Sequence, residues 1–295
     1  FFFILLTFFP LSLILGNLII NTFIFLFSIS FIINFKENKF YLNNNIIYLL
    51  LFFFTSLVVN IIFSLFPVNS APRVIKIIFI IIFIIKILRI FNKYELNILK
   101  NIFFIWSIIL IIVVLDCFFE AIFGFNTLGN STPLTGRIAS FFGEEIIVGA
   151  FLHGFALIFI GYLINQNSNN YFIAFCILTL IVISFLIGER SNFIKLFFSI
   201  MLLSIIGIKV NYLYKILSFI TIFGLIVGIL NVNQDYKHRY YDQIKKLYEK
   251  DGLISYYKNS QYGAHHYTAV KVFYEFPIFG VGIKNFRYES SKPKY

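Results

Sequence analysis

The sequence predicts an all-α membrane protein: a bundle of transmembrane helices followed by a large loop outside the membrane. Of its 295 residues, 60% are hydrophobic and 13% are charged, whereas a soluble domain carries roughly 25% charged residues. Apolar runs near the length that crosses a bilayer, about 20 residues, recur along most of the chain. Because lipid offers no hydrogen-bond partners to the backbone, such runs are expected to be helices.

We predict about nine spanning helices, by the length that a bilayer requires. They cover residues 1–15, 18–35, 46–66, 74–91, 101–123, 145–164, 171–187, 192–208 and 214–231. Pro10, Gly16 and Asn17 separate the first two. Residues 1–231 thus form the predicted bundle, and residues 232–295 a polar, tyrosine-rich periplasmic loop. In that loop, apolar residues at helical spacing predict short interfacial helices at 238–250 and 264–275.

Lysine and arginine in the short loops predict the orientation. If the spans alternate, one side carries Lys36, Lys39, Arg89, Lys93, Lys100, Lys209 and Lys215. That side is expected to be the cytoplasm. The opposite side, the periplasm of a bacterium, carries Arg73, Arg137, Arg190, Arg239 and Arg287. Arginine presents a planar fork of donors that suits phosphate or carboxylate, so this face is the candidate binding face.

Charge and cysteine content narrow the classes of partner. A net charge of +11 is compatible with nucleic acid, but most basic residues lie in loops between spans or in the last polar segment. A phosphate-bearing lipid or a membrane surface is therefore the expected partner. Cys117 and Cys176 lie inside apolar runs without the spacing of metal ligands, so we expect no metal and no cofactor. Since the only methionine is Met201, we expect the chain to be a piece of a longer protein.

The first candidate site is the segment 135–145, just before a predicted span. It places Arg137 between Gly136 and Gly143. One interpretation is a phosphate clamp at the mouth of the bundle. The other is an ordinary interfacial arginine paired with Glu144.

The second candidate is the turn Gly188-Glu189-Arg190-Ser191 between two apolar runs. It leaves no room for a solvated loop, so Arg190 is expected at or below the headgroups. An arginine at that depth usually has a partner. Glu189 and a lipid diphosphate are the two alternatives.

The third candidate runs from Pro277 to Arg287 and contains Gly280-Val281-Gly282. Two glycines permit a tight turn and a close approach of the backbone. No strand precedes them and a third glycine is missing, so this is not a dinucleotide-binding signature. Farther back, Asp116 and Glu120 are one turn apart on one helix face and could orient Arg137 or bind a proton.

Together the three segments resemble the bacterial O-antigen ligases and O-antigen polymerases, polytopic transferases of lipid-linked glycans. That family shares a periplasmic arginine in a small-residue loop before a span and a small-x-Arg-Ser turn after a later span. It also shares a Pro-apolar-apolar-Gly-x-Gly element in a long periplasmic loop. Here these features are Arg137, residues 188–191 and residues 277–282, in the family's order. The resemblance covers residues 130–295.

The chain also departs from the family pattern. Glu144-Glu145 stand where members often have Asn-Pro. His265 or His266 stands where many carry an arginine. The family's catalytic histidine follows the Gly-x-Gly element, so the resemblance implies a catalytic base beyond Tyr295. The secondary candidates for diphosphate contacts are Arg239, His265, His266, Gly280, Gly282 and Arg287.

The resemblance implies a metal-independent glycan transferase of the bacterial inner membrane with a periplasmic active face. Undecaprenyl diphosphate would carry the glycan, and Arg137 and Arg190 would hold the diphosphate. The acceptor would be a sugar of lipid A–core in a ligase, or a second lipid-linked glycan in a polymerase. A transporter or flippase for a lipid or anionic substrate is the alternative, although no internal repeat supports it. A structural membrane subunit would need no outward arginines.

Overall fold

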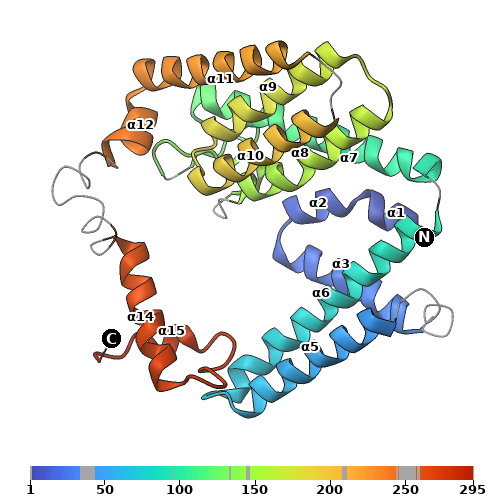
Figure 1. The fold of residues 1–295 in the computed structure, drawn as a ribbon, viewed down its shortest axis with the longest axis vertical. Coiled ribbons are helices and arrows are strands. Elements are labelled where there is room, and N and C mark those ends of the chain that lie inside the picture. The colour runs from blue at the N-terminus through green and yellow to red at the C-terminus, as the bar shows by residue number, and fades with distance from the viewer. Residues whose placement is uncertain are drawn as a thin grey trace. The chain divides into compact units, whose positions relative to one another are not determined.

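The computed structural model is all-helical, as the sequence predicts. It describes residues 2–33, 44–94, 96–132, 134–143, 147–207, 211–243, 245, 257 and 260–294. About 80% of it is helix, and none of these residues lies in a β-strand (Figure 1).

Packing divides the chain into two compact units, each built from segments far apart in the sequence. Unit 1 comprises residues 1–20 and 95–246, and unit 2 comprises residues 21–94 and 247–295. Both the predicted bundle, 1–231, and the predicted loop, 232–295, therefore contribute to each unit. The side of the membrane on which each segment lies stays a prediction.

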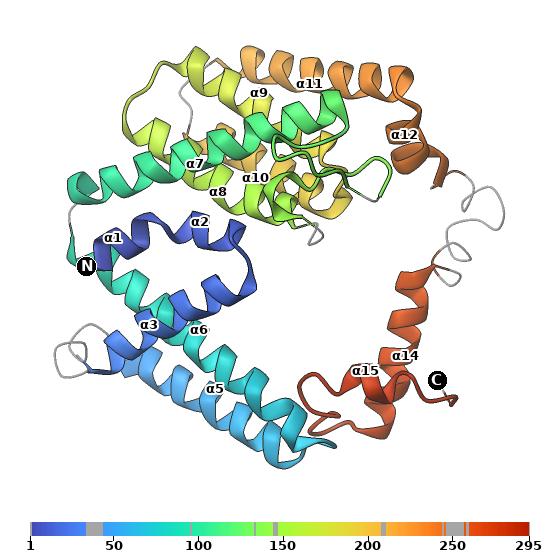
Figure 2. The same ribbon diagram turned by 180° about the vertical axis from the view of Figure 1, so that it is seen from behind.

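Unit 1 is a helical bundle (Figures 1 and 2). Its elements are α1 (Phe2–Thr7), α2 (Phe9–Ile14), α7 (Leu96–Phe123), the 3-10 turn η2 (Ser140–Phe142), α8 (Val148–Asn165), α9 (Asn170–Leu186), α10 (Arg190–Gly207), α11 (Tyr212–Val232), α12 (Gln234–Lys237) and the π-helical turn η3 (His238–Asp242). Asparagine side chains begin three of the helices. Asn169, Asn211 and Asn233 accept hydrogen bonds from the first free N–H groups of α9, α11 and α12.

The core of unit 1 joins α1 and α2 to α7 and α8. Trp106 on α7 donates from Nε1 to the carbonyl of Leu6, at 3.0 Å. Its ring meets Phe155 of α8 edge-on, with centroids 5.5 Å apart. Because the indole N–H is satisfied by a helix backbone, the whole ring can be buried at this junction.

Unit 2 contains most of α3 (Asn17–Ile33), together with α5 (Asn44–Ile62), α6 (Pro67–Lys93), α14 (Gln261–Glu275) and α15 (Phe286–Glu289). Phe27 on α3 stacks on Phe23 and meets Phe83 of α6 edge-on, at centroid distances of 4.9 and 5.5 Å. Ser28 donates to the carbonyl of Phe79 at 2.7 Å. These contacts fix α3 against α6.

Within the described residues, four helices are long and apolar enough to cross a membrane. They are Leu99–Phe123, Val148–Asn165, Arg190–Gly207 and Lys215–Val232. Three shorter apolar helices cover Asn17–Ile33, Tyr48–Ile62 and Asn170–Leu186. The helix α6 has 27 residues, but five basic residues interrupt its apolar sequence: Arg73, Lys76, Lys86, Arg89 and Lys93. The chain therefore has membrane-helix character, and nine spans remain the finer prediction.

Three local predictions have different outcomes. Residues 1–15, expected as one helix, form two helices of six residues that break at Phe8, just ahead of Pro10. The helix expected at 264–275 is confirmed, beginning earlier at Gln261, where Ser260 accepts from the N–H of Gly263. The helix expected at 238–250 begins as η3, and residues 246–250 lie outside the described residues.

Candidate functional site

The turn that follows α9 is the centre of the candidate site in unit 1. Four successive carbonyls, those of residues 185–188, each accept a hydrogen bond from another segment. The donors are the Tyr240 hydroxyl at 2.8 Å, the Tyr236 hydroxyl at 2.9 Å, the Ile138 N–H at 3.2 Å and the Arg239 Nε–H at 2.7 Å. A helix end leaves its last carbonyls without intrahelical partners. The sequence supplies those partners from residues 124–143, the segment after α7 that we call the Arg137 loop, and from the segment after α11.

Two glycines allow this turn and the Arg137 loop to touch. Gly136 and Gly188 have φ angles of +67° and +76°, where side chains are strained. A Cβ on Gly188 would lie 2.1 Å from the Gly136 carbonyl oxygen, and one on Gly136 would meet Arg239 Cδ at 3.4 Å. Glycine is therefore required at Gly188 both by conformation and by space.

Tyr236 and Tyr240 attach the segment after α11 to the end of α9. Besides its hydrogen bond, Tyr240 stacks on Phe185 with centroids 4.4 Å apart. Burial is the largest cause that raises the pKa of Tyr236 to about 12. It also raises the pKa of Tyr240. Since the two tyrosines are four residues apart, they flank Arg239 and hold it beside the turn.

Three arginines come close together at this turn. Arg239 donates to the Gly188 carbonyl, two residues before Arg190, and its Cδ lies 3.4 Å from the position of a Cβ on Gly136, the residue before Arg137. The pKa of Arg239 is lowered, first by burial and then by the positive charges of Arg137 and Arg190. Arg239 had been a secondary candidate by sequence, and the structure brings it together with the two primary ones. Three cations that repel one another make a site that favours an anion.

Arg190 and Glu189 do not form the ion pair that one interpretation required. Arg190, the first residue of α10, donates from Nη2 to the side-chain oxygen of Gln243. Glu189 instead accepts from the Gly149 N–H at 3.2 Å and from the Asn192 side chain. Among the described residues, no ion pair joins Glu189 to an arginine of this site.

Arg137 is half-buried at the end of its loop, and its backbone N–H donates to the Leu134 carbonyl at 3.2 Å. Its Nε is buried without a hydrogen-bond partner among the described residues. Glu144, the alternative partner, lies outside those residues. Asp116 and Glu120 both contact the Arg137 loop, through its backbone and hydroxyl groups.

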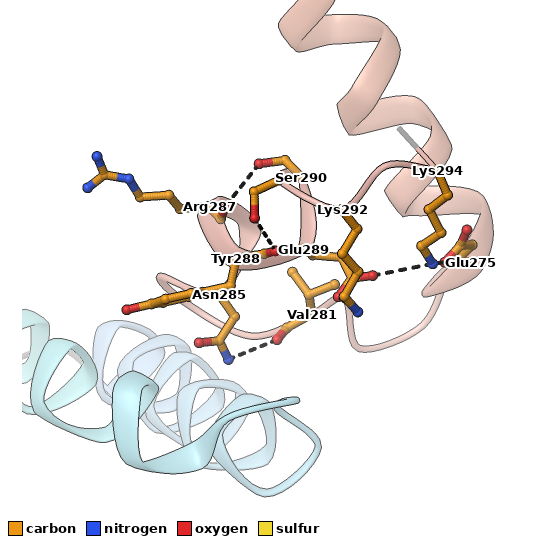
Figure 3. A network of polar contacts seen from close by, with 10 residues as sticks. Glu275, Val281, Asn285, Arg287, Tyr288, Glu289, Ser290, Lys292 and Lys294 are labelled. Atoms are coloured by element: carbon orange, nitrogen blue, oxygen red, sulfur yellow. Dashed lines mark hydrogen bonds and ion pairs between the residues drawn. The ribbon is translucent and has the colours of Figure 1, made fainter.

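The other secondary candidates belong to unit 2. His265 and His266 are exposed on α14, and the ring of His266 contacts the Tyr257 hydroxyl. Arg287 is exposed on α15 and points away from the ion pairs that Glu289 makes with Lys292 and Lys294 (Figure 3).

The Gly-x-Gly element packs against the end of α5 and the start of α6. The Asn60 side chain accepts from the Ile283 N–H and donates to the Phe279 carbonyl, both at 3.1 Å. A Cβ on Gly282 would lie 2.4 Å from Ser64 Oγ, whereas one on Gly280 would meet nothing within 4 Å. Gly282 is thus required by close packing within unit 2.

Comparison with known proteins adds no relative. No family model, curated protein or solved structure matches the chain. The assignment of a function therefore depends on the arginine site itself and on the order of the motifs in the sequence.

Proposed function

We propose that the chain belongs to a membrane-embedded transferase that moves a glycan from undecaprenyl diphosphate to an acceptor sugar hydroxyl. It would act in the assembly of a bacterial surface polysaccharide, as an O-antigen ligase or polymerase does. The observation that carries the proposal is the gathering of Arg137, Arg190 and Arg239. These residues come from three separate segments: the loop between α7 and α8, the start of α10, and η3.

The charges of the site suit a lipid diphosphate. A diphosphate that links a lipid to a sugar carries two negative charges, and three arginines face it with forked donors. Glu189 accepts from Gly149 and Asn192 and forms no ion pair with these arginines among the described residues, although its negative charge also acts on Arg239. The Arg239 Nε is bound to the Gly188 carbonyl. That bond uses the Nε–H and leaves the terminal nitrogens of Arg239 for contacts with a diphosphate.

The chemistry that such a site supports is stabilisation of a leaving group. The acceptor hydroxyl oxygen forms a bond to the anomeric carbon, and the bond from that carbon to the diphosphate oxygen breaks. The electron pair leaves with undecaprenyl diphosphate, and the hydroxyl proton passes to a general base. Arginines fixed beside the diphosphate stabilise the charge that grows on it in the transition state.

The test is complementation of a strain that lacks the gene, read on a gel of its lipopolysaccharide. Wild type should restore long chains, while Arg190→Lys and Arg239→Lys should not, because lysine cannot make the forked contact. Arg73→Lys is the matched control, since Arg73 is an exposed arginine of unit 2. Polymer left on the carrier lipid would indicate a ligase, and single repeats on the core a polymerase.

The same strain separates the proposal from a transporter. A flippase defect would leave the lipid-linked glycan on the cytoplasmic face, where enzymes added to spheroplasts cannot reach it. An unchanged ladder after deletion, or full activity of Arg190→Lys, would count against the diphosphate site.

A further inference from the structure

Two buried carboxylates lie on α7 behind the Arg137 loop. Asp116 and Glu120 are one turn apart on the same helix face, with 2% and 5% of their surface exposed. Burying a carboxylate is costly unless a cation or several donors satisfy it. No ion pair joins either residue to an arginine in the described part of the chain. Their partners are instead the backbone and hydroxyl groups of the loop.

Asp116 holds both ends of the loop. Its Oδ1 accepts from the backbone N–H of Thr127 at 2.8 Å and from the Thr127 hydroxyl at 2.6 Å. Its Oδ2 accepts from the Ser140 hydroxyl at 2.5 Å. Residues 127 and 140 enclose Arg137, so one side chain ties down the segment on either side of it.

Glu120 holds the backbone next to Arg137. Its Oε2 accepts from the Ser140 N–H at 2.7 Å, and its Oε1 accepts from the Ala139 N–H at 3.3 Å. Oε1 also accepts from the Thr132 hydroxyl at 2.6 Å. Both oxygens of Glu120 therefore face a backbone donor, which cannot be turned into an acceptor.

Ser140 shows that the carboxylates impose a conformation. Its φ is +51°, in the left-handed region that residues other than glycine rarely adopt. The Asn126 side chain donates to its carbonyl at 2.7 Å, so its N–H, hydroxyl and carbonyl are all bound. Two residues earlier, the Ile138 N–H donates to the Ile187 carbonyl in the turn after α9. The strained geometry at Ser140 thus sets the direction in which the Arg137 loop meets that turn.

We propose that Asp116 and Glu120 are positioning residues of the anion site, which fix the Arg137 loop as hydrogen-bond acceptors and do not neutralise its arginines. The inference rests on the proposed diphosphate site. The role of each carboxylate as an acceptor can be tested apart from its negative charge, because each can be replaced by an amide of the same shape.

The two amides have different consequences. In Glu120→Gln, either orientation of the amide sets an NH₂ group against a backbone N–H. In Asp116→Asn, the remaining oxygen still accepts from Thr127, and the NH₂ group can donate to the Ser140 hydroxyl, which turns to accept. Both variants remove one negative charge from the same helix face, so an effect of charge alone would make them alike.

The experiment measures hydrogen exchange in residues 126–142 and the affinity for inorganic pyrophosphate, on the full-length protein in detergent micelles. In Glu120→Gln, the loop amides should exchange at least about tenfold faster, because a buried hydrogen-bond acceptor is lost. The Kd for pyrophosphate should rise by at least about the same factor. Asp116→Asn should stay within about threefold of wild type in both measurements. Asp116→Asn is the matched variant, because it removes a charge and keeps each donor of the loop partnered.

Each outcome decides a different statement. Equal losses in the two amide variants, or unchanged exchange in Glu120→Gln, overturn the positioning role. Faster exchange in Glu120→Gln together with a wild type that does not bind pyrophosphate supports the role of the carboxylates in the loop and contradicts the diphosphate site.

Discussion

Replacing Gly188 by alanine should open the contact on which the arginine site is built. The new Cβ would lie 2.1 Å from the Gly136 oxygen, and contacts under 3.0 Å are essentially never found, so the two turns must separate by at least the difference. That movement lengthens the 3.2 Å hydrogen bond from Ile138, which lies two residues after Gly136. The new Cβ would also lie 3.2 Å from Arg239 Nε, so it displaces the 2.7 Å bond that this nitrogen donates to the Gly188 carbonyl.

The cost can be added from its parts. A left-handed φ costs alanine about 1–2 kcal/mol. The neutral hydrogen bond contributes about 1 kcal/mol and the charged one about 2 kcal/mol. The local contact is therefore destabilised by about 4–5 kcal/mol, of which about 3 kcal/mol belongs to the two hydrogen bonds.

The assay is isothermal titration of the purified full-length protein with pyrophosphate, beside its melting temperature. We expect the affinity of Gly188→Ala to fall at least about tenfold, or 1.4 kcal/mol. Gly129→Ala is the matched control, because Gly129 also has a positive φ, of +83°, but a Cβ there meets nothing within 4 Å. Equal losses of affinity in the two variants would refute the reasoning.

Three further changes test other parts of the structure. Arg239→Lys should weaken pyrophosphate binding several-fold and Arg73→Lys should leave it unchanged, because Arg239 donates to the Gly188 carbonyl in the arginine site whereas Arg73 lies in unit 2; titration calorimetry compares them. Burial raises the pKa of Tyr236 to about 12, above the usual value of about 10, so its neutral form stabilises the fold. This contribution is complete below about pH 10 and is lost as the pH rises to about 12. The differences between wild type and Tyr236→Phe in tyrosinate absorbance and in melting temperature should follow this course. Gly282→Ala should lower the melting temperature by several degrees more than Gly280→Ala, because only its Cβ meets Ser64; similar shifts would contradict the packing argument.

Hydropathy predicted most helix positions because apolar length is a local property of the sequence. The ends of α7, α8 and α11 at Phe123, Asn165 and Val232 lie within two residues of prediction. The break at Phe8 was missed, because a run of apolar residues conceals a change of direction. Pro10 gave the signal for it, since a proline is tolerated only in the first turn of a helix.

The sequence singled out the arginines of the candidate site but not the residues that hold them. Arg137 and Arg190 stood out because arginine on the predicted outer face needs a local reason. The structure brings them together with Arg239. Tyr236 and Tyr240 were missed, since the apolar spacing after residue 238 predicted only an interfacial helix. Two tyrosines four residues apart, directly after a spanning helix, were the available signal, but nothing local in the sequence shows that they cap α9.

The carboxylates illustrate the same limit. Their spacing placed Asp116 and Glu120 on one helix face, and that prediction left open whether they orient an arginine or bind a proton. Which donors reach them depends on how the loop folds back over α7. That is a tertiary property, set by Asn126 and by the left-handed Ser140.

The sequence order of the three arginines has a consequence for biosynthesis. Arg137 can meet the turn at Gly188 only after α8 and α9 have both been inserted. Arg239 is translated later still, after α10 and α11. The proposed anion site is thus absent from every shorter nascent chain, and its three arginines come together last, when Tyr236 and Tyr240 bind the end of α9. A ribosome-bound intermediate that ends before residue 236 should accordingly expose the carbonyls at the end of α9 and hold no diphosphate.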